Sequence, residues 1–275
     1  MFNQINIKMK IMMKTKVWML AIVALSFGVV SCDEEEDPPA INEAEVLVEY
    51  MEDPTSPAAN YGNSGLAIKS PEAVHTLMAA DKVYIIDIRK PEHFATGHIE
   101  GAVNLTAGEV RAHLDANDLS AYDEISIVCY SGQTASWLTS LLQLAGYKDV
   151  YSMKWGMSGW HSDFDSWTGN INSDKSTMWD QPEVEKGPEV ELPTLTTGYE
   201  DGADIFEARY AAVLAEGFSP AAAISQSDVY ANLDDYYIIN YWPHAEYLDP
   251  GHIEGAMQYT PNEDLALSAS LKTLP

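Results

Sequence analysis

Residues 125–136 read ISIVCYSGQTAS, an apolar β-branched run of strand length that ends at a cysteine, Cys129. A short loop containing Gly132 follows, and from Trp137 to Gly146 the apolar spacing is helical. A strand–loop–helix unit of this kind places Cys129 at the carboxyl end of a buried strand, with the loop amides at a helix N-terminus. Those amides favour a thiolate, a persulfide or an oxyanion. We therefore predict that Cys129 is a nucleophile. The alternative is a small buried hydrophobic side chain.

The flanking sequence alternates between strand and helix patterns. Ser70 followed by Pro71 predicts the start of a helix that runs to about Ala80. The run at 83–86 predicts a buried strand, a helix is expected around 109–115, and residues 150–153 predict another strand. This alternation predicts an α/β fold whose mostly parallel sheet is covered by helices on both faces.

Composition excludes several classes of partner. The 275 residues are 46% hydrophobic, enough for one or two ordinary cores, and carry a formal charge of −27 with a pI near 4.3. So acidic a chain is a poor electrostatic match for nucleic acid or anionic lipid. The seven histidines are scattered and no Cys–His spacing fits zinc, so we predict neither a metal site nor a cofactor.

The N-terminal 31 residues have the pattern of an export signal. Four lysines precede an apolar run at 17–30, which ends in Ser31 and Cys32. This resembles the lipobox of bacterial lipoproteins, in which the cysteine becomes the acylated first residue; the alternative is an ordinary signal peptide with a chance cysteine. Removal of residues 1–31 would bring the charge to −31. We expect a lipid-anchored protein of the bacterial cell envelope, on the periplasmic or surface side of the outer membrane.

The chain beyond the signal divides into four predicted parts. Residues 32–64 form an acidic tether with a leading helix and loop, residues 65–169 form the main domain, and residues 170–202, rich in proline and acids, form a linker. In the last part, 203–275, GHIEGA at 251–256 repeats GHIEGA at 97–102 without a change. The position equivalent to Cys129 would be 283, past the end of the sequence given. The second copy is therefore partial and degenerate, or cut short in the sequence given, and we expect no chemistry from it.

Four motifs between about Ile68 and Trp167 together resemble the rhodanese (thiosulfate sulfurtransferase) family. They are DIR at 87–89, GHIEGA at 97–102, CYSGQTA at 129–135 and WGMSGW at 155–160. The resemblance implies a parallel five-stranded sheet wrapped by helices. It also implies that Cys129 takes a sulfane sulfur from a donor, holds it as a persulfide and passes it to a thiophilic acceptor. The backbone amides expected to bind that sulfur belong to Tyr130, Ser131, Gly132, Gln133, Thr134 and Ala135.

Two details of the motifs refine this expectation. The loop from Cys129 to Thr134 has six residues, whereas related phosphatases use a longer loop and place an arginine six residues after the nucleophile, where this chain has Ala135. Phosphatase activity is therefore not expected. Asp87 and Arg89, at a strand end, are expected to form a structural ion pair near the site rather than to act in catalysis.

The nature of the sulfur donor stays open at this stage. Many thiosulfate-using relatives have a lysine or arginine in this loop, and this chain has none. The nearby cations by sequence are Arg89, Lys90, Arg111 and Lys154. A protein or small-molecule persulfide is therefore an alternative to thiosulfate. We predict that this protein is an enzyme, a rhodanese-type sulfurtransferase, whose sulfur donor and acceptor are small molecules or proteins. The alternative is a catalytically weak rhodanese-like module that binds a partner or senses sulfur or redox state.

Overall fold

The computed structural model describes residues 41–59, 67–171, 179–180, 182–261, 263–264 and 271–274 of the chain. The predicted signal at 1–31, the acylation site Cys32 and the acidic run after it lie outside the described residues. Within the described ranges, no helix is both long enough and apolar enough to cross a bilayer.

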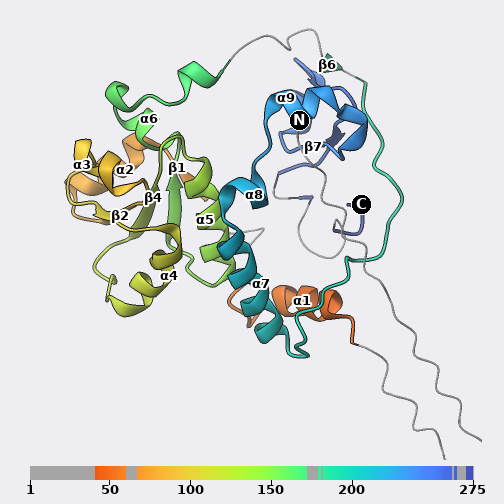
Figure 1. Ribbon diagram of the computed structural model, residues 1–275, viewed down its shortest axis with the longest axis horizontal. Helices are drawn as coiled ribbons and strands as arrows, with labels where there is room; N and C mark the ends of the chain where they lie inside the picture. The colour runs from red at the N-terminus through yellow and green to blue at the C-terminus, as the bar shows by residue number, and fades with distance from the viewer. Residues whose placement is uncertain are drawn as a thin grey trace, which may run out of the picture. The chain divides into compact units, whose positions relative to one another are not determined.

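Five parallel strands form the sheet that carries the cysteine, in the order β1-β5-β4-β2-β3 (Figure 1). Their bounds are Ile68–Lys69 (β1), Val83–Asp87 (β2), Val103–Asn104 (β3), Glu124–Val128 (β4) and Val150–Met153 (β5). From β2 the chain winds to β3 at one side, and from β4 it winds to β5 at the other. The winding direction therefore changes between β2 and β4, and in open parallel sheets ligands bind at the carboxyl ends of two such strands.

Helices cover both faces of this sheet, which confirms the predicted α/β fold. Their bounds are Pro71–Ala79 (α2), Pro91–Thr96 (α3), Ala107–Ala116 (α4), Gln133–Leu144 (α5) and Gly156–Trp160 (α6). Alternate residues of β2 point to opposite faces. Ile86 packs with α4 and α5 in one buried cluster, and Ile85 packs with α2 and α6 in the other. Ser70 accepts a hydrogen bond from the Ala73 N–H at 3.2 Å and caps α2 at its predicted start.

Three further helices lie outside the motifs but pack against the elements around the sheet. Helix α1 (Glu43–Glu52) packs against α7 (Gly202–Glu216), which also contacts α4. The Glu43 carboxylate accepts hydrogen bonds from the N–H groups of Thr197 and Gly198, at 2.6 and 2.9 Å. Helix α8 (Phe218–Ala222) follows α7 at once and packs against α5. Consequently α8 lies next to the helix that begins at the cysteine loop.

The remaining elements are short. Those near the end of the first domain are the 3-10 helices Ser162–Phe164 (η2) and Thr168–Asn170 (η3). Those beyond it are Trp179–Asp180 (β6), Gln226–Ala231 (α9), Leu233–Asp235 (η4), Ile239–Asn240 (β7), His244–Leu248 (α10), His252–Ile253 (β8) and Met257–Gln258 (β9). Strand β6 pairs with β8 antiparallel, and β7 pairs with β9 parallel. Part of the predicted linker is therefore hydrogen-bonded to the C-terminal segment.

The contacts around the first GHIEGA motif recur around the second. The Nδ1 atom of His98 lies 2.9 Å from the carbonyl oxygen of Phe94, and the rings of the two residues stack with their centres 3.8 Å apart. Likewise, the Nδ1 atom of His252 lies 2.9 Å from the carbonyl oxygen of Tyr247, and the rings of the two residues stack with their centres 3.7 Å apart. Pairing of β7 with β9 likewise repeats that of β2 with β3. These contacts are what a repeat of β2–α3–β3 requires, and the identity of this segment as a rhodanese-like copy stays a prediction.

Candidate active site

Cys129 follows the last residue of β4 and is 3% exposed. Its Sγ atom accepts hydrogen bonds from the backbone N–H groups of Gly132, at 3.2 Å, and Ala135, at 3.4 Å. Both donors belong to the turn that opens α5, where the first N–H groups of a helix have no partner within the helix. The sulfur therefore lies where an anion is stabilised by backbone amides and by the helix dipole.

Two glycines allow the loop to close around the sulfur. Gly132 has φ +87°, a left-handed conformation that glycine adopts without a steric penalty. Gly156, at the start of α6, lies so close to the loop that a Cβ atom on it would stand 2.3 Å from the carbonyl oxygen of Cys129. That same oxygen accepts a hydrogen bond from the Met157 N–H at 2.8 Å. The turn after β5 therefore fixes the backbone of the cysteine from behind.

The other predicted loop residues surround this centre. Tyr130, Ser131 and Thr134 are half-buried, Gln133 is exposed, and Ala135 is buried. The carbonyl of Tyr130 accepts hydrogen bonds from the N–H and hydroxyl groups of Ser158, at 3.0 and 2.9 Å. Within the described loop, the amides bonded to Sγ are those of Gly132 and Ala135. The amides of Tyr130, Ser131, Gln133 and Thr134 belong to the same loop. A second sulfur atom attached to Sγ would have to approach these amides to be hydrogen-bonded by them.

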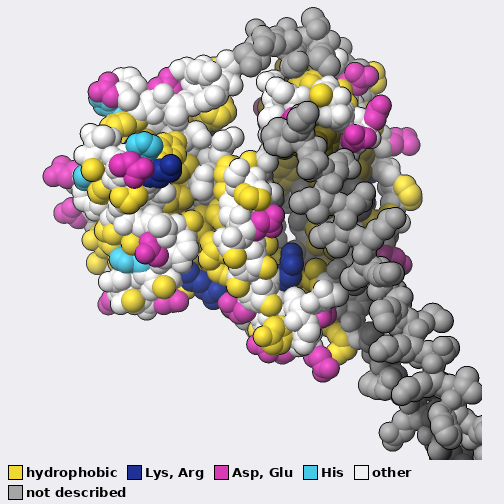
Figure 2. Space-filling model, in the orientation of Figure 1, with side chains coloured by type: hydrophobic (Ala, Val, Ile, Leu, Met, Phe, Trp, Pro, Cys, Tyr) yellow, Lys and Arg dark blue, Asp and Glu magenta, His cyan; other side chains and the backbone are white. Residues whose placement is uncertain are grey.

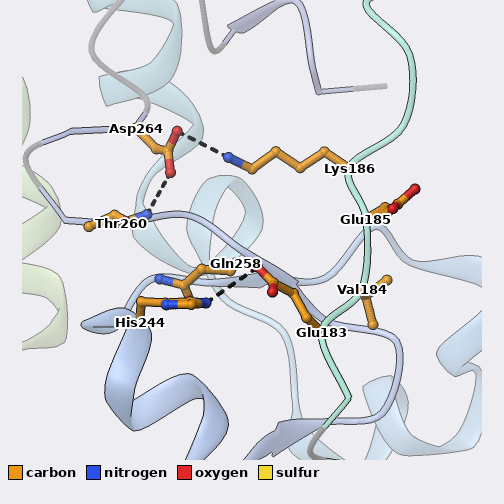
Figure 3. A pocket seen from close by; sticks show the side chains of 8 residues that line it. All are labelled: Glu183, Val184, Glu185, Lys186, His244, Gln258, Thr260 and Asp264. Atoms are coloured by element: carbon orange, nitrogen blue, oxygen red, sulfur yellow. Dashed lines mark hydrogen bonds and ion pairs between the residues drawn. The ribbon is translucent and has the colours of Figure 1, made fainter.

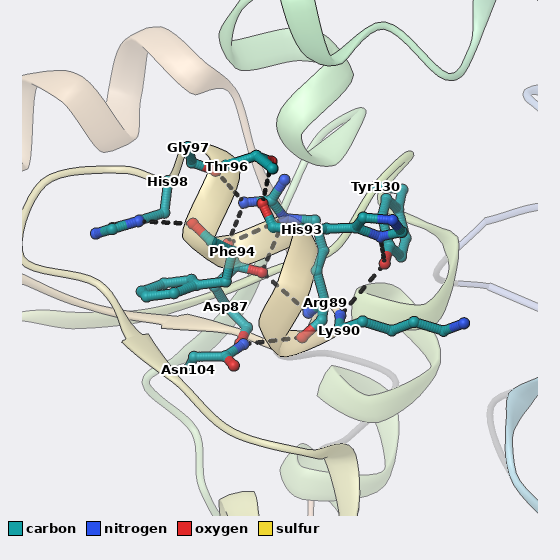
Figure 4. Close-up of polar contacts among 10 residues, drawn as sticks. All are labelled: Asp87, Arg89, Lys90, His93, Phe94, Thr96, Gly97, His98, Asn104 and Tyr130. Carbon is teal, nitrogen blue, oxygen red and sulfur yellow. Dashed lines mark hydrogen bonds and ion pairs between the residues drawn. The ribbon is translucent and has the colours of Figure 1, made fainter.

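Asp87 and Arg89 form a buried ion pair at the end of β2, 1% and 3% exposed (Figure 4). The Arg89 Nη2 atom donates to Asp87 at 2.7 Å and to the carbonyl oxygen of Gly97 at 2.7 Å. The Asn104 amide, at the end of β3, donates to the carbonyl oxygens of Asp87 and Arg89 at 2.8 Å each. Each of the two charged side chains is bonded to the other and to a backbone group, so the pair holds the β2–α3 turn in place.

That turn carries a histidine against the cysteine loop. The hydroxyl of Tyr130 lies 2.6 Å from Nδ1 of His93 in α3 and accepts a hydrogen bond from the Lys90 N–H at 3.2 Å (Figure 4). The two rings meet edge to face at 5.4 Å. The residue after the nucleophile is therefore tied to the turn that the Asp87–Arg89 pair supports.

Two of the four candidate cations are already paired. Arg89 is held by Asp87, and Arg111 donates two hydrogen bonds, at 2.7 and 2.8 Å, to Glu207 of α7, which raise the pKa of Arg111. Lys90 and Lys154 are exposed, and the ammonium group of Lys154 lies 5.3 Å from the ring centre of Trp155. Figure 2 shows acidic side chains spread over the visible face, with basic ones in only a few places. A dianion near the cysteine would therefore meet little positive charge.

The turn after β5 contains a strained tryptophan. Trp155 has φ +62°, although a left-handed backbone disfavours every side chain with a Cβ atom by about 1–2 kcal/mol. The side chain is 41% exposed and packs on Trp167, with ring centres 4.7 Å apart. Residues kept in such conformations concentrate at functional sites.

A separate cavity of about 590 Å³ lies in the C-terminal segment, between the predicted linker and β9 (Figure 3). Two pairs of its ionisable groups lie within reach of each other: Lys186 with Asp264 at 3.0 Å, and His244 with Glu183 at 3.3 Å. None of its described lining residues is a cysteine. Among the described residues, no group of three or more His, Cys, Asp and Glu side chains is placed to bind a metal ion.

Several residues of the site were not anticipated from the sequence. Asn104 and His93 could have been noticed, since each is polar and lies next to a predicted strand end or turn. Gly156 was part of a quoted motif, but its contact with the cysteine carbonyl depends on how β5 lies beside β4. Phe218, 89 residues after Cys129, packs near Trp137 of α5 with ring centres 6.3 Å apart, and no local pattern in the sequence predicted this contact.

The domain that carries this site is similar to known proteins. Residues 70–163 match the family model described as Rhodanese-like domain. A thiosulfate sulfurtransferase of Pseudomonas putida is 32% identical over 104 residues, which cover 38% of this chain and 93% of that enzyme. A putative sulfur carrier protein of Bacillus subtilis is 34% identical over 80 residues, covering 29% of this chain and 42% of that protein. A solved structure, a human single-domain sulfurtransferase, is 22% identical, covers 35% and 96% of the two chains, and has a TM-score of 0.29.

A matched pair of glycine substitutions tests the packing behind the cysteine. Gly156→Ala should lower the free energy of unfolding by more than about 2 kcal/mol, because its Cβ would overlap backbone atoms and its φ is +53°. Gly108→Ala in α4 meets no atom within 4 Å and should stabilise the protein by about 0.5–1 kcal/mol. Urea unfolding followed by circular dichroism measures both. Equal effects from the two changes would contradict this description of the loop.

Proposed function

This chain belongs to the rhodanese family, and we propose that it is a sulfurtransferase in which Cys129 carries the transferred sulfur as a persulfide. At the level of the family, a sulfurtransferase-type role follows from relatives that bear that name. The finer proposal concerns which residue holds the sulfur and how. It is supported mainly by one observation, the two backbone N–H groups directed at Cys129 Sγ.

The position of this cysteine also supports the proposal. Cys129 follows β4, and β4 is paired with β2 across the point where the sheet changes its winding direction. A persulfide is an anion at neutral pH, and backbone amides stabilise it without relying on water. The amides of Gly132 and Ala135 hold the inner sulfur, and those of Tyr130, Ser131, Gln133 and Thr134 border the space for the outer one.

The proposed reaction has two transfers of the same sulfur atom. In the first, the Cys129 thiolate attacks the sulfane sulfur of the donor. The new S–S bond forms as the donor's bond to that sulfur breaks, and its electron pair leaves with the rest of the donor. In the second, the acceptor's nucleophile attacks the outer sulfur of the persulfide and its bond to Sγ breaks, which returns the thiolate. Neither step needs an external oxidant or a cofactor.

The charges around the site favour a donor other than a small dianion. Arg89 and Arg111 are paired with carboxylates, so that Lys90 and Lys154 are the nearby cations outside such pairs. Thiosulfate would gain little from this surrounding. We therefore propose a small-molecule or protein persulfide, or another singly charged sulfane compound, as the donor, and a thiol or similar nucleophile as the acceptor.

A second candidate function is a rhodanese-like module that binds a partner or senses sulfur or redox state with little turnover. The observation that favours it is the burial of Cys129, which is 3% exposed. Sulfur loading would then be a signal rather than a catalytic step. The two functions differ in one measurable respect, because only the first requires the loaded sulfur to pass repeatedly to an acceptor.

The cellular location is also a proposal. The lipobox-like sequence ending at Cys32 supports a lipid anchor at the bacterial cell envelope, with the protein on the periplasmic or surface side of the outer membrane. The acidic residues after it, 33–37, would keep the domain away from the anionic membrane surface.

Intact mass measurement tests the persulfide directly. After incubation with thiosulfate, mercaptopyruvate or an organic persulfide, the protein should gain the mass of one sulfur atom, and cyanide should remove it. Cys129→Ser should gain nothing from any donor, while circular dichroism shows that it stays folded. Loading without repeated turnover would support the sensing module. Folded protein with a titratable thiol and no gain from any donor would contradict the proposed sulfurtransferase.

Fractionation tests the anchor. The full chain expressed in a Gram-negative host should sediment with the membranes and be released by detergent, because a lipidated N-terminus partitions into the bilayer. Cys32→Ser should move the protein to the soluble or unprocessed fraction, whereas Cys129→Ser should leave its location unchanged. A full chain that is soluble and carries no lipid would contradict the proposal.

A further inference from the structure

An aromatic groove lies beside the cysteine loop. It measures about 570 Å³, within the usual range of small-molecule sites, and runs between β1, α5, the turn before α6, and α8. One end is formed by the loop residues Ser131, Gly132 and Gln133. Its aromatic walls are Trp137, Trp155, Trp167 and Phe218.

The groove and the reactive sulfur share Gly132. The N–H of Gly132 donates to Cys129 Sγ at 3.2 Å, and the same residue lines the groove. A molecule bound there in contact with Gly132 therefore has one end next to the sulfur. The groove therefore adjoins the loop that holds the sulfur, although Cys129 itself is not among the lining residues.

The walls are supplied partly by segments outside the family match at 70–163. Trp167 follows η2, and Phe218 begins α8, where its ring lies 6.3 Å from that of Trp137. Trp155 belongs to the match but has a left-handed backbone, φ +62°, while its side chain, which lines the groove, stays 41% exposed. A half-exposed tryptophan kept at such a position is consistent with a side chain that is used for binding.

One of the described residues that line the groove is a cation. Lys154 lines it and lies over the Trp155 ring, 5.3 Å from the ring centre, and its charge also acts on the Glu72 carboxylate. The other lining residues that the structure describes are uncharged. A ligand that matches this site has a flat apolar body, for the aromatic walls, and a single negative charge.

We propose that this groove binds the organic part of the sulfur donor, an aromatic or similarly flat apolar compound whose sulfane sulfur carries one negative charge. This inference rests on the proposed function and adds the class of substrate. With a thiosulfonate of this class, the Cys129 thiolate attacks the terminal sulfur. The new S–S bond forms, the bond between that sulfur and the sulfonyl sulfur breaks, and the electron pair leaves on the sulfinate.

Binding is measured without chemistry by calorimetry with benzenesulfonate, which has no sulfur to transfer. The full chain should bind it, and Trp155→Gly and Phe218→Ala should each weaken binding at least about fivefold. Glycine is the residue best suited to the backbone at 155, so that this variant should fold. Trp242→Ala, at a tryptophan that is 51% exposed in the C-terminal segment, is the matched control and should bind as the original does. Equal affinity in all four proteins, or no binding at millimolar concentration, would overturn the proposal.

Kinetics separate this proposal from the one on which it rests. Sulfur loading by benzenethiosulfonate should exceed that by methanethiosulfonate roughly tenfold in kcat/KM, since the two differ in the ring that the groove would bury. That ratio should fall towards one in Trp155→Gly and Phe218→Ala but not in Trp242→Ala. If both compounds loaded the protein with equal kcat/KM, the proposal that the groove binds the organic part of the donor would be contradicted, but the sulfurtransferase proposal would not. If none of these compounds, thiosulfate or an organic persulfide loaded the protein with sulfur, the proposed sulfurtransferase activity would be contradicted. The calorimetry would still show whether the groove binds its ligand.

Discussion

Two backbone N–H groups directed at one sulfur atom are the feature on which the rest of this structure depends. They point at Cys129 because Gly132 turns the chain with a positive φ and because Gly156 lies against the carbonyl behind the sulfur. The strand order places that carbonyl and the turn after β5 side by side, since β4 pairs directly with β5. A larger residue at 156 would displace the cysteine backbone before it disturbed any side chain.

At the end of the neighbouring strand, β2, a buried ion pair stabilises the turn that follows. Asp87 and Arg89 satisfy one another and two backbone groups, the Arg89 N–H and the Gly97 carbonyl, and removal of either would leave a buried charge at a cost of about 3–5 kcal/mol. The corresponding place in the C-terminal segment has Asn240, whose side-chain amide donates to Gln258 at 3.0 Å, while Gln258 donates to the carbonyl of Trp242 at 2.7 Å. Neutral amides can therefore hold a turn of this kind, although that turn supports no cysteine.

The parts of this molecule that the sequence predicted are those set by neighbours along the chain. The alternation of strands and helices, the N-cap at Ser70 and the position of Cys129 at a strand end follow from local pattern, and each agrees with the structure. Contacts between distant segments could not be read in this way. Phe218 next to Trp137 depends on α7 packing against α1 and α4, and the pairing of Arg111 with Glu207 joins residues 96 positions apart.

The central claim, that backbone amides of the cysteine loop hold a sulfur-loaded Cys129, is tested most directly by nitrogen-15 NMR of the protein before and after loading. An amide proton that donates to a more anionic sulfur moves downfield. The negative charge of a persulfide lies on its outer sulfur, so the account predicts the largest such shifts at the amides that border that sulfur, those of Tyr130, Ser131, Gln133 and Thr134. It predicts smaller changes at Gly132 and Ala135, which donate to the inner sulfur, and none at Gly255 in the C-terminal segment. Sulfur-loaded protein in which none of the amide signals from Tyr130 to Thr134 moves would contradict it.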